Sequence, residues 1–124
     1  MKKFSYRLQK LLDAKLAHER EIQYELAKVV AEQNKLRLKQ DEYRNKIEEQ
    51  KKNFHQKIVG GEKMIQDLLM FQRFADFADK AIDAYEKEIE SMNPKVFEIR
   101  GRLTEAMKER KTIEKHKEKK CSKR

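Results

Sequence analysis

The sequence predicts an all-α protein folded as one long antiparallel two-helix coiled coil, and three observations support this prediction. Charged residues make up 43% of the chain and hydrophobic residues 38%, whereas ordinary globular domains are about 25% charged. Apolar side chains recur at alternating spacings of four and three. The adjacent glycines Gly60 and Gly61 divide the chain into nearly equal arms. So little apolar material is enough for a narrow seam between helices, but not for a thick core.

The first arm has a heptad stripe with polar interruptions. Steps of four and three from Leu8 pass through fourteen positions, of which nine are apolar. Lys15, Glu19, Gln33 and Gln40 interrupt the stripe. The pattern is typical of a coiled-coil helix and not of a disordered polar chain.

The second arm has a more continuous stripe, running from Met64 to Ile113 with fourteen apolar positions in fifteen. Its phase persists past Pro94, the only proline. We therefore expect a continuous helix that is kinked at Pro94. The alternative is a third helix that starts at Pro94, since proline suits a first helical position.

These patterns predict a single coiled-coil domain over residues 1–124. Helix one is expected over about 3–58, the turn over about 59–62, helix two over about 63–117 and a basic tail over about 118–124. Paired residue numbers should add up to about 121, which places Leu8 near Ile113 and Tyr43 near Ala78. Both termini then meet at one end of the hairpin.

Charge is concentrated at that end. The formal net charge is +9, and residues 108–124 hold nine Lys or Arg and three Glu. Lys2, Lys3, Arg7 and Lys10 add to it from the first arm. Such an end suits an acidic groove, an acidic pore or a polyanion, although a solvated tail is the alternative explanation.

Three phenylalanines, Phe71, Phe74 and Phe77, cluster in the second arm. A helix spreads them over an arc of about 120°, so a narrow seam does not hold all three. We expect Phe74 and Phe77 at the flank or outside, where exposed apolar surface marks a partner site. The alternative is that Phe54, Ile47 and Ile58 cover them.

The sequence does not indicate an enzyme, a cofactor or a metal site. His18, His55 and His116 are isolated from one another, and the glycine pair lacks the rest of a phosphate-binding loop. Cys121 is the one cysteine of the sequence and lies in a polar tail, so an internal disulfide cannot form. Because no secretory signal or membrane span is evident, we expect a cytoplasmic protein.

Several ordered segments resemble the FliJ family, the small coiled-coil proteins of the flagellar type III export apparatus. The opening residues 4–12 (FSYRLQKLL) are similar to the family's start. Residues 42–44 (EYR), 71–74 (FQRF) and 80–82 (KAI) follow in the family's order. The close, residues 105–111 (EAMKERK) and 113–115 (IEK), resembles the family's end, although His116 stands where the family tends to have leucine.

The resemblance implies a stalk-like rod in bacterial flagellum biogenesis and motility. Such proteins place the joined ends of the hairpin in the pore of the FliI-type export ATPase, contact the FlhA-type export gate protein and assist export chaperones. The protein would lie in the cytoplasm, peripherally at the inner face of the cell membrane, with no small-molecule substrate and no nucleic acid partner. The family's terminal motifs give the ATPase-binding candidates Phe4, Arg7, Leu8, Leu11, Arg110, Lys111 and Ile113.

The same resemblance gives a set of export-gate-binding candidates. They are Phe74, Ala78, Ala81 and Tyr85 in the second arm, with Leu36 and Tyr43 in the first. The heptad pattern conflicts with this set, because it places Leu36, Tyr43, Ala78 and Tyr85 in the seam. The heptad pattern places neither Phe74 nor Ala81 in the seam, so these two candidates agree with both lines of reasoning.

Three alternatives remain open on sequence alone. The first is the equivalent stalk protein of an injectisome type III secretion system. The second is a basic coiled coil that binds nucleic acid, for which binding should fall steeply with salt. The third is a scaffolding coiled coil that self-associates along its seam.

Overall fold

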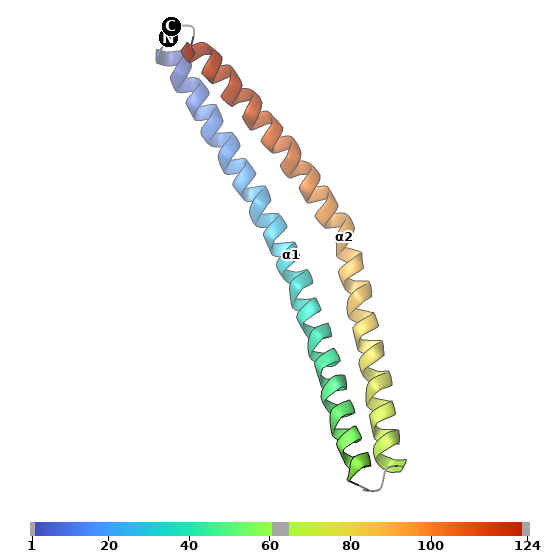
Figure 1. Cartoon of the computed structure of the whole chain (residues 1–124). Coiled ribbons are helices and arrows are strands. Elements are labelled where there is room, and N and C mark those ends of the chain that lie inside the picture. Colours follow the sequence, from blue (N-terminus) through green and yellow to red (C-terminus); the bar gives the residue numbers. More distant parts are fainter. Residues whose placement is uncertain (1, 61–64, 123–124) are drawn as a thin grey trace. The chain divides into compact units, whose positions relative to one another are not determined.

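The computed structural model describes residues 2–60 and 65–122 and contains two helices, α1 (Lys2–Val59) and α2 (Ile65–Ser122). Figure 1 shows the two helices joined as a hairpin, which confirms the predicted all-α fold. Residues 61–64, which include Gly61 and the expected seam residue Met64, lie outside the described residues. Helix one was expected to end near residue 58 and helix two to begin near residue 63, and in the structure α1 ends at Val59 and α2 begins at Ile65.

The helices begin and end where local chemistry favours it. The amide N–H of Gly60 donates to the carbonyl of Gln56 at 3.0 Å, which completes the last turn of α1. Lys57 lies in that last turn and Asp67 in the first turn of α2, so both charges oppose the helix dipoles. Their side chains also approach each other to 3.8 Å.

Helix α2 is continuous through Pro94. The alternative of a third helix that starts at this residue is therefore wrong. Proline removes one backbone N–H from the helical ladder, and the kink expected from that loss stays a prediction. At its other end α2 extends to Ser122, five residues past the expected end. The reason is that residues 114–120 are mainly Lys and Glu, which are good helix formers, with no Gly or Pro among them.

The chain forms two compact units. Unit 1 contains residues 1–30 and 93–124, and unit 2 contains residues 31–92. In unit 1 the first turns of α1 lie beside the last turns of α2 (Figure 1), and the rings of Phe4 and His116 lie 6.1 Å apart. The prediction that the two terminal segments meet is therefore confirmed for the described residues.

The buried side chains form the predicted seam. Every side chain classed as buried among the described residues lies at a position of the two heptad stripes. In unit 1 these are Leu12, Glu19, Ile22, Val29, Val96, Ile99 and Ala106, and in unit 2 they are Gln33, Leu36, Gln40, Ala78 and Ile89. The four-and-three spacing therefore identified the core of both units.

The polar interruptions in the first stripe are matched by partners on α2. In unit 2, the Nε2 of Gln33 donates to the carbonyl of Ile89 at 3.1 Å, and the Nε2 of Gln40 donates to the carbonyl of Ile82 at 3.0 Å. In the described part of the chain, no buried side-chain nitrogen or oxygen lacks a hydrogen-bond partner. Because an unpaired buried polar group is costly, these bonds favour one register of the two helices.

The contacts between the two helices include pairs at the expected register. Leu8 and Ile113, whose numbers add up to 121, line one groove in unit 1. The numbers of contacting residues add up to values between 120, for Phe4 with His116, and 129, for Glu19 with Arg110. The expected value of about 121 lies within this range.

Candidate partner-binding surfaces

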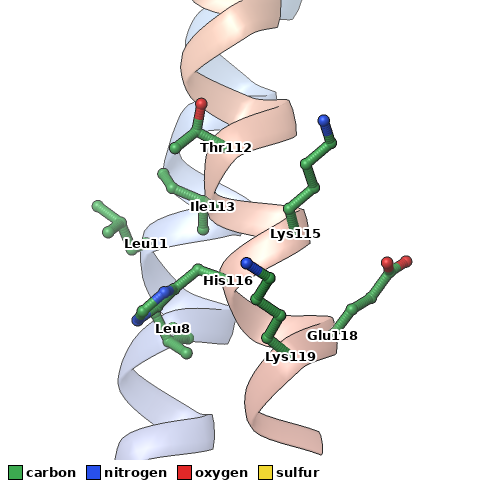
Figure 2. Close-up of a pocket in the computed structure, with 8 residues that line it drawn as sticks. All are labelled: Leu8, Leu11, Thr112, Ile113, Lys115, His116, Glu118 and Lys119. Atoms are coloured by element: carbon green, nitrogen blue, oxygen red, sulfur yellow. The ribbon is translucent and has the colours of Figure 1, made fainter. Parts of the chain in front are cut away.

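The first candidate surface is a groove in unit 1, called here the terminal groove. It is lined by Leu8 and Leu11 of α1 and by Thr112, Ile113, Lys115, His116, Glu118 and Lys119 of α2. Figure 2 shows Ile113 and His116 beside the two leucines, while Lys115 and Glu118 point away from them. Phe4 and Leu11 are exposed apolar residues at this end. The groove thus combines an apolar floor with a charged rim.

Most of the ATPase-binding candidates lie in or near this groove. Leu8, Leu11 and Ile113 line it, and the ring of Phe4 packs edge-on against that of His116. Arg7 and Lys111 are exposed cations next in sequence to the lining residues Leu8 and Thr112. A bond from the Lys117 ammonium to the Gln9 side-chain oxygen joins α1 and α2 here.

Arg110 differs from the other candidates because its side chain is largely occupied within the seam. Its Nε donates to the carboxylate of Glu19 at 2.6 Å, and a terminal guanidinium nitrogen donates to Glu114 at 2.8 Å. These two hydrogen bonds raise the pKa of Arg110 above its usual range. The arrangement holds the buried Glu19 in an ion pair, so Arg110 joins α1 to α2 within unit 1.

The second candidate surface is an aromatic face of unit 2, formed by Tyr43, Phe74, Phe77 and Tyr85. The ring of Tyr43 meets that of Phe77 edge-on at 6.1 Å and lies 6.3 Å from that of Tyr85. The ammonium groups of Lys39 and Lys46 lie over the rings of Tyr85 and Tyr43, at 5.7 and 5.8 Å. Phe77 is 61% exposed, as the sequence predicted for a residue outside the seam.

The structure separates the gate-binding candidates into two groups. Ala78 has no exposed surface and Leu36 is also buried, so both lie in the seam, as the heptad pattern expected. Phe74, Ala81, Tyr43 and Tyr85 are half-buried and keep surface on the flank. Only this second group offers side chains that a partner can touch in the described hairpin.

Sequence reasoning missed one apolar surface, next to the turn in unit 2. The rings of Phe54 and Phe71 stack there with their centroids 6.0 Å apart, so Phe71 packs against helix α1. Around them Ile58, Val59, Ile65, Leu68, Leu69 and Met70 are exposed. The missed signal was the run of apolar residues from Leu68 to Phe71, which the heptad stripe explains only in part.

The described residues contain neither a candidate metal site nor a candidate membrane span. Across residues 2–60 and 65–122, no group of His, Cys, Asp and Glu side chains has an arrangement that would hold a metal ion. Neither α1 nor α2, over the same residues, has a stretch long and apolar enough to cross a membrane.

The fold defines a class, the antiparallel two-helix coiled coils. Within that class, the family model described as "Flagellar FliJ protein" matches residues 4–124, and the chain belongs to this family. A search of curated proteins and a search of solved structures each gave no match. Family membership indicates a component of the flagellar export apparatus.

Proposed function

We propose that this protein is a non-enzymatic, stalk-like hairpin that binds a FliI-type export ATPase through unit 1 and a FlhA-type export gate protein through unit 2. It would thereby couple the ATPase to protein export. The observation that carries the proposal is the family match over residues 4–124, which includes both terminal segments of the hairpin. The two candidate surfaces supply a separate place for each partner.

The terminal groove supports the ATPase contact. Its apolar floor, Leu8, Leu11 and Ile113, has the hydrophobic character of an interface centre. Arg7 and Lys111 add exposed positive charge beside it, which steers an acidic partner toward this end. The contact then depends on apolar burial for affinity and on charge for orientation.

The aromatic face supports the gate contact. Tyrosine and phenylalanine bury much surface at little entropic cost and dominate many interfaces. The flank of unit 2 carries the rings of Tyr43, Phe74, Phe77 and Tyr85. Ala81 lies on the same flank and has a short side chain. The proposal also includes assistance to export chaperones and a peripheral position at the inner membrane face, and the family match supports both.

The test is the ATP hydrolysis rate and ring assembly of a purified FliI-type ATPase, with and without this protein. We expect both to rise with the wild-type chain. The charge-reversal pair Arg7→Glu and Lys111→Glu should abolish the rise without altering the fold, because both side chains are exposed. Lys35→Glu, an exposed lysine of unit 2, is the matched control and should behave like the wild type.

The outcomes separate the proposal from its alternatives. If the wild-type chain leaves hydrolysis and assembly unchanged over a wide concentration range, the ATPase contact is refuted. Tight binding of DNA or RNA that weakens steeply with salt would instead support the nucleic-acid alternative. A loss of effect in the Lys35 variant as large as that in the Arg7 and Lys111 variant would refute the assignment to the terminal groove.

A further inference from the structure

One exposed face of α2 in unit 2 is acidic. Five carboxylate side chains recur along it at spacings of three and four, and all are exposed: Asp76, Asp79, Asp83, Glu86 and Glu90. With about 100° between successive helical residues, they lie within an arc of about 80°. Asp83 pairs with Lys87 on its own helix at 3.4 Å, and Glu86 accepts from Gln40. An exposed pair within one helix contributes little stability, so the face as a whole stays negative.

One exposed face of α2 in unit 1 is basic. Lys108, Lys111 and Lys115 follow one another at spacings of three and four, and all three are exposed. The same helical geometry places them within an arc of about 60°. Lys108 approaches Glu105 to 3.8 Å, again an exposed pair within one helix. Figure 2 shows the side chain of Lys115 pointing away from the floor of the terminal groove, so its ammonium group lies at the surface.

Phe97 belongs to the same face of unit 1. It lies 18 residues before Lys115, which is five full turns at about 3.6 residues per turn, so the two side chains leave α2 in the same direction. Its ring is 82% exposed, the largest value among the exposed large hydrophobic side chains of the described residues. A single exposed apolar side chain is ordinary, so its meaning depends on how the charged residues are arranged around it.

Gly101 lies one turn past Phe97, and packing within its own chain does not explain it. A glycine in a helix interior lowers helix stability relative to alanine. A Cβ added at Gly101 would meet no atom of the described residues within 4 Å. Because the missing side chain exposes the backbone, Gly101 leaves room beside Phe97 for the close approach of another helix.

The acidic and basic residues are arranged symmetrically in sequence about Phe97. Three pairs of opposite charge lie at equal distances of 18, 14 and 11 residues on either side of it: Asp79 and Lys115, Asp83 and Lys111, Glu86 and Lys108. When two copies of α2 run antiparallel with Phe97 opposite its counterpart, each of these acidic residues lies opposite a lysine of the other copy. One twofold axis therefore produces two equivalent sets of contacts, each between unit 2 of one copy and unit 1 of the other.

We propose that this face of α2 binds a second copy of this chain, in an antiparallel homodimer with Phe97 at the twofold axis. The face carries both signs of charge, in an order that an antiparallel copy of itself matches. A polyanion would be repelled by the acidic half and a uniformly basic partner by the lysines. The seam of each hairpin stays closed, in contrast to the scaffolding alternative. The contact requires neither the ATPase nor the gate, so it goes beyond the proposed function and stands or fails independently of it.

The dimer leaves the aromatic face of unit 2 accessible. Phe77 lies two residues before Asp79 and therefore about 160° away from it around α2. Dimerisation and binding at the aromatic face involve opposite sides of the helix, so each is measured without interference from the other.

The test is an exchange of charges, with the mass of the full-length chain measured by sedimentation equilibrium at low salt. We expect the wild-type chain to associate reversibly to twice its mass of 15.0 kDa and to dissociate as salt is added. Asp79→Lys with Asp83→Lys makes the face predominantly basic, and Lys111→Glu with Lys115→Glu makes it predominantly acidic. Each double variant alone should have a dissociation constant raised about tenfold or more, because like charges then face one another. An equimolar mixture of the two should dimerise like the wild type, because opposite charges again meet at all four positions.

Glu42→Lys with Glu49→Lys is the matched control, since it makes the same change of charge at exposed residues of α1. It should dimerise like the wild type, and circular dichroism checks that every variant stays helical. A wild-type chain that remains monomeric at low salt over a wide concentration range overturns the proposal. A mixture of the two charge variants that remains monomeric, although both are helical, overturns it as well.

Disulfide trapping tests the position of the axis. In a Cys121→Ser background, Phe97→Cys places a thiol opposite its own counterpart, so mild oxidation should give a covalent dimer. Tyr24→Cys, at another exposed ring of unit 1, is the matched control and should not cross-link. Equal cross-linking at the two positions would overturn the placement of Phe97 at the axis.

Discussion

The side-chain amide of Gln40 donates across the seam of unit 2 to the carbonyl oxygen of Ile82, at 3.0 Å, and to the carboxylate of Glu86, at 2.9 Å. Both acceptors belong to α2, so a single buried glutamine fixes the pairing of the two helices. A buried polar residue in a coiled coil commonly lowers the stability of the fold and at the same time favours one register and one oligomeric state. Gln33, which donates to Ile89, repeats the arrangement two turns away.

Replacing this glutamine with leucine is expected to relax specificity without loss of stability. Gln40→Leu adds an apolar residue to the seam and removes both cross-helix hydrogen bonds. We expect a thermal midpoint at or above that of the wild type, together with a higher apparent mass in light scattering as chains associate. Gln50→Leu, at an exposed position of the same stripe, is the matched control. A Gln40→Leu chain with a clearly lower midpoint and unchanged mass would contradict the role of the glutamine in register.

Arg110 and Lys111 are adjacent, but substituting them is expected to change different properties. Arg110 affects the stability of the fold, and Lys111 affects binding to the ATPase. Arg110→Met leaves the buried carboxylate of Glu19 without its cation, so the thermal midpoint should fall. Lys111→Met changes an exposed side chain and should leave the midpoint unchanged while it weakens ATPase stimulation. The double variant Glu19→Gln with Arg110→Met should recover much of the lost stability in a double-mutant cycle. Additive losses in that cycle would show that the pair is not coupled.

The fold could be predicted from the sequence because three independent patterns indicated the same structure. Heptad spacing, the glycine pair and the paucity of helix breakers all favoured the same hairpin, and the buried side chains of both units follow the stripe. The end of α2 lies five residues past the predicted one. A single sequence does not determine such boundaries, because the residues at a helix end differ little in free energy between the helical and the non-helical state.

The candidate surfaces were predicted less completely than the seam. Family motifs included Leu36 and Ala78 among contact residues, although packing buries both. Arg110 occupies the one polar position of the second heptad stripe and was an ATPase-binding candidate, but its pairing with Glu19 was not predicted. Glu19 lies far away in the sequence, and only the pairing of α1 with α2 brings the two side chains together. The apolar surface around Phe54 and Phe71 was not predicted, because an apolar stripe that broadens at a helix end resembles an ordinary seam in the sequence.

Acid should weaken unit 1 through the pair formed by Lys15 and Glu109. The hydrogen bond from Lys15, at 2.9 Å, and its positive charge lower the pKa of Glu109 below its usual range. A lowered folded pKa stabilises the fold above the unfolded value, about 4.3, and this contribution is lost as the pH falls through the folded value. The stability difference between wild type and Lys15→Met should therefore be constant from about pH 6 to 8 and shrink toward about pH 3.

Chemical denaturation at a series of pH values measures this difference. Lys35→Met, at an exposed lysine of α1, is the control and should show no such convergence with the wild type. Because the carboxylate is at the surface, the effect is small and is best seen at low salt. A Lys15→Met chain whose stability stays parallel to the wild type down to about pH 3 would refute the assigned cause.

Phe77 is expected to contribute to gate binding although the family motifs do not include it. Its ring is 61% exposed and meets that of Tyr43 edge-on, so it extends the aromatic face of unit 2 outward. Phe77→Ala should leave the thermal midpoint nearly unchanged, because little buried surface is lost. It should weaken binding to the cytoplasmic domain of a FlhA-type gate protein by about tenfold or more, as expected of an aromatic residue at an interface centre.

Calorimetric titration of the gate domain against the variant provides the measurement. Phe97→Ala removes a ring that is 82% exposed in unit 1 and should leave the affinity unchanged. Tyr43→Phe keeps the ring contact with Phe77 and should also bind normally, which separates a ring contact from a hydroxyl contact. If Phe77→Ala and Phe97→Ala bind equally well, the gate does not use the outer part of the aromatic face. The contact would then be confined to the half-buried Phe74, Ala81 and Tyr85.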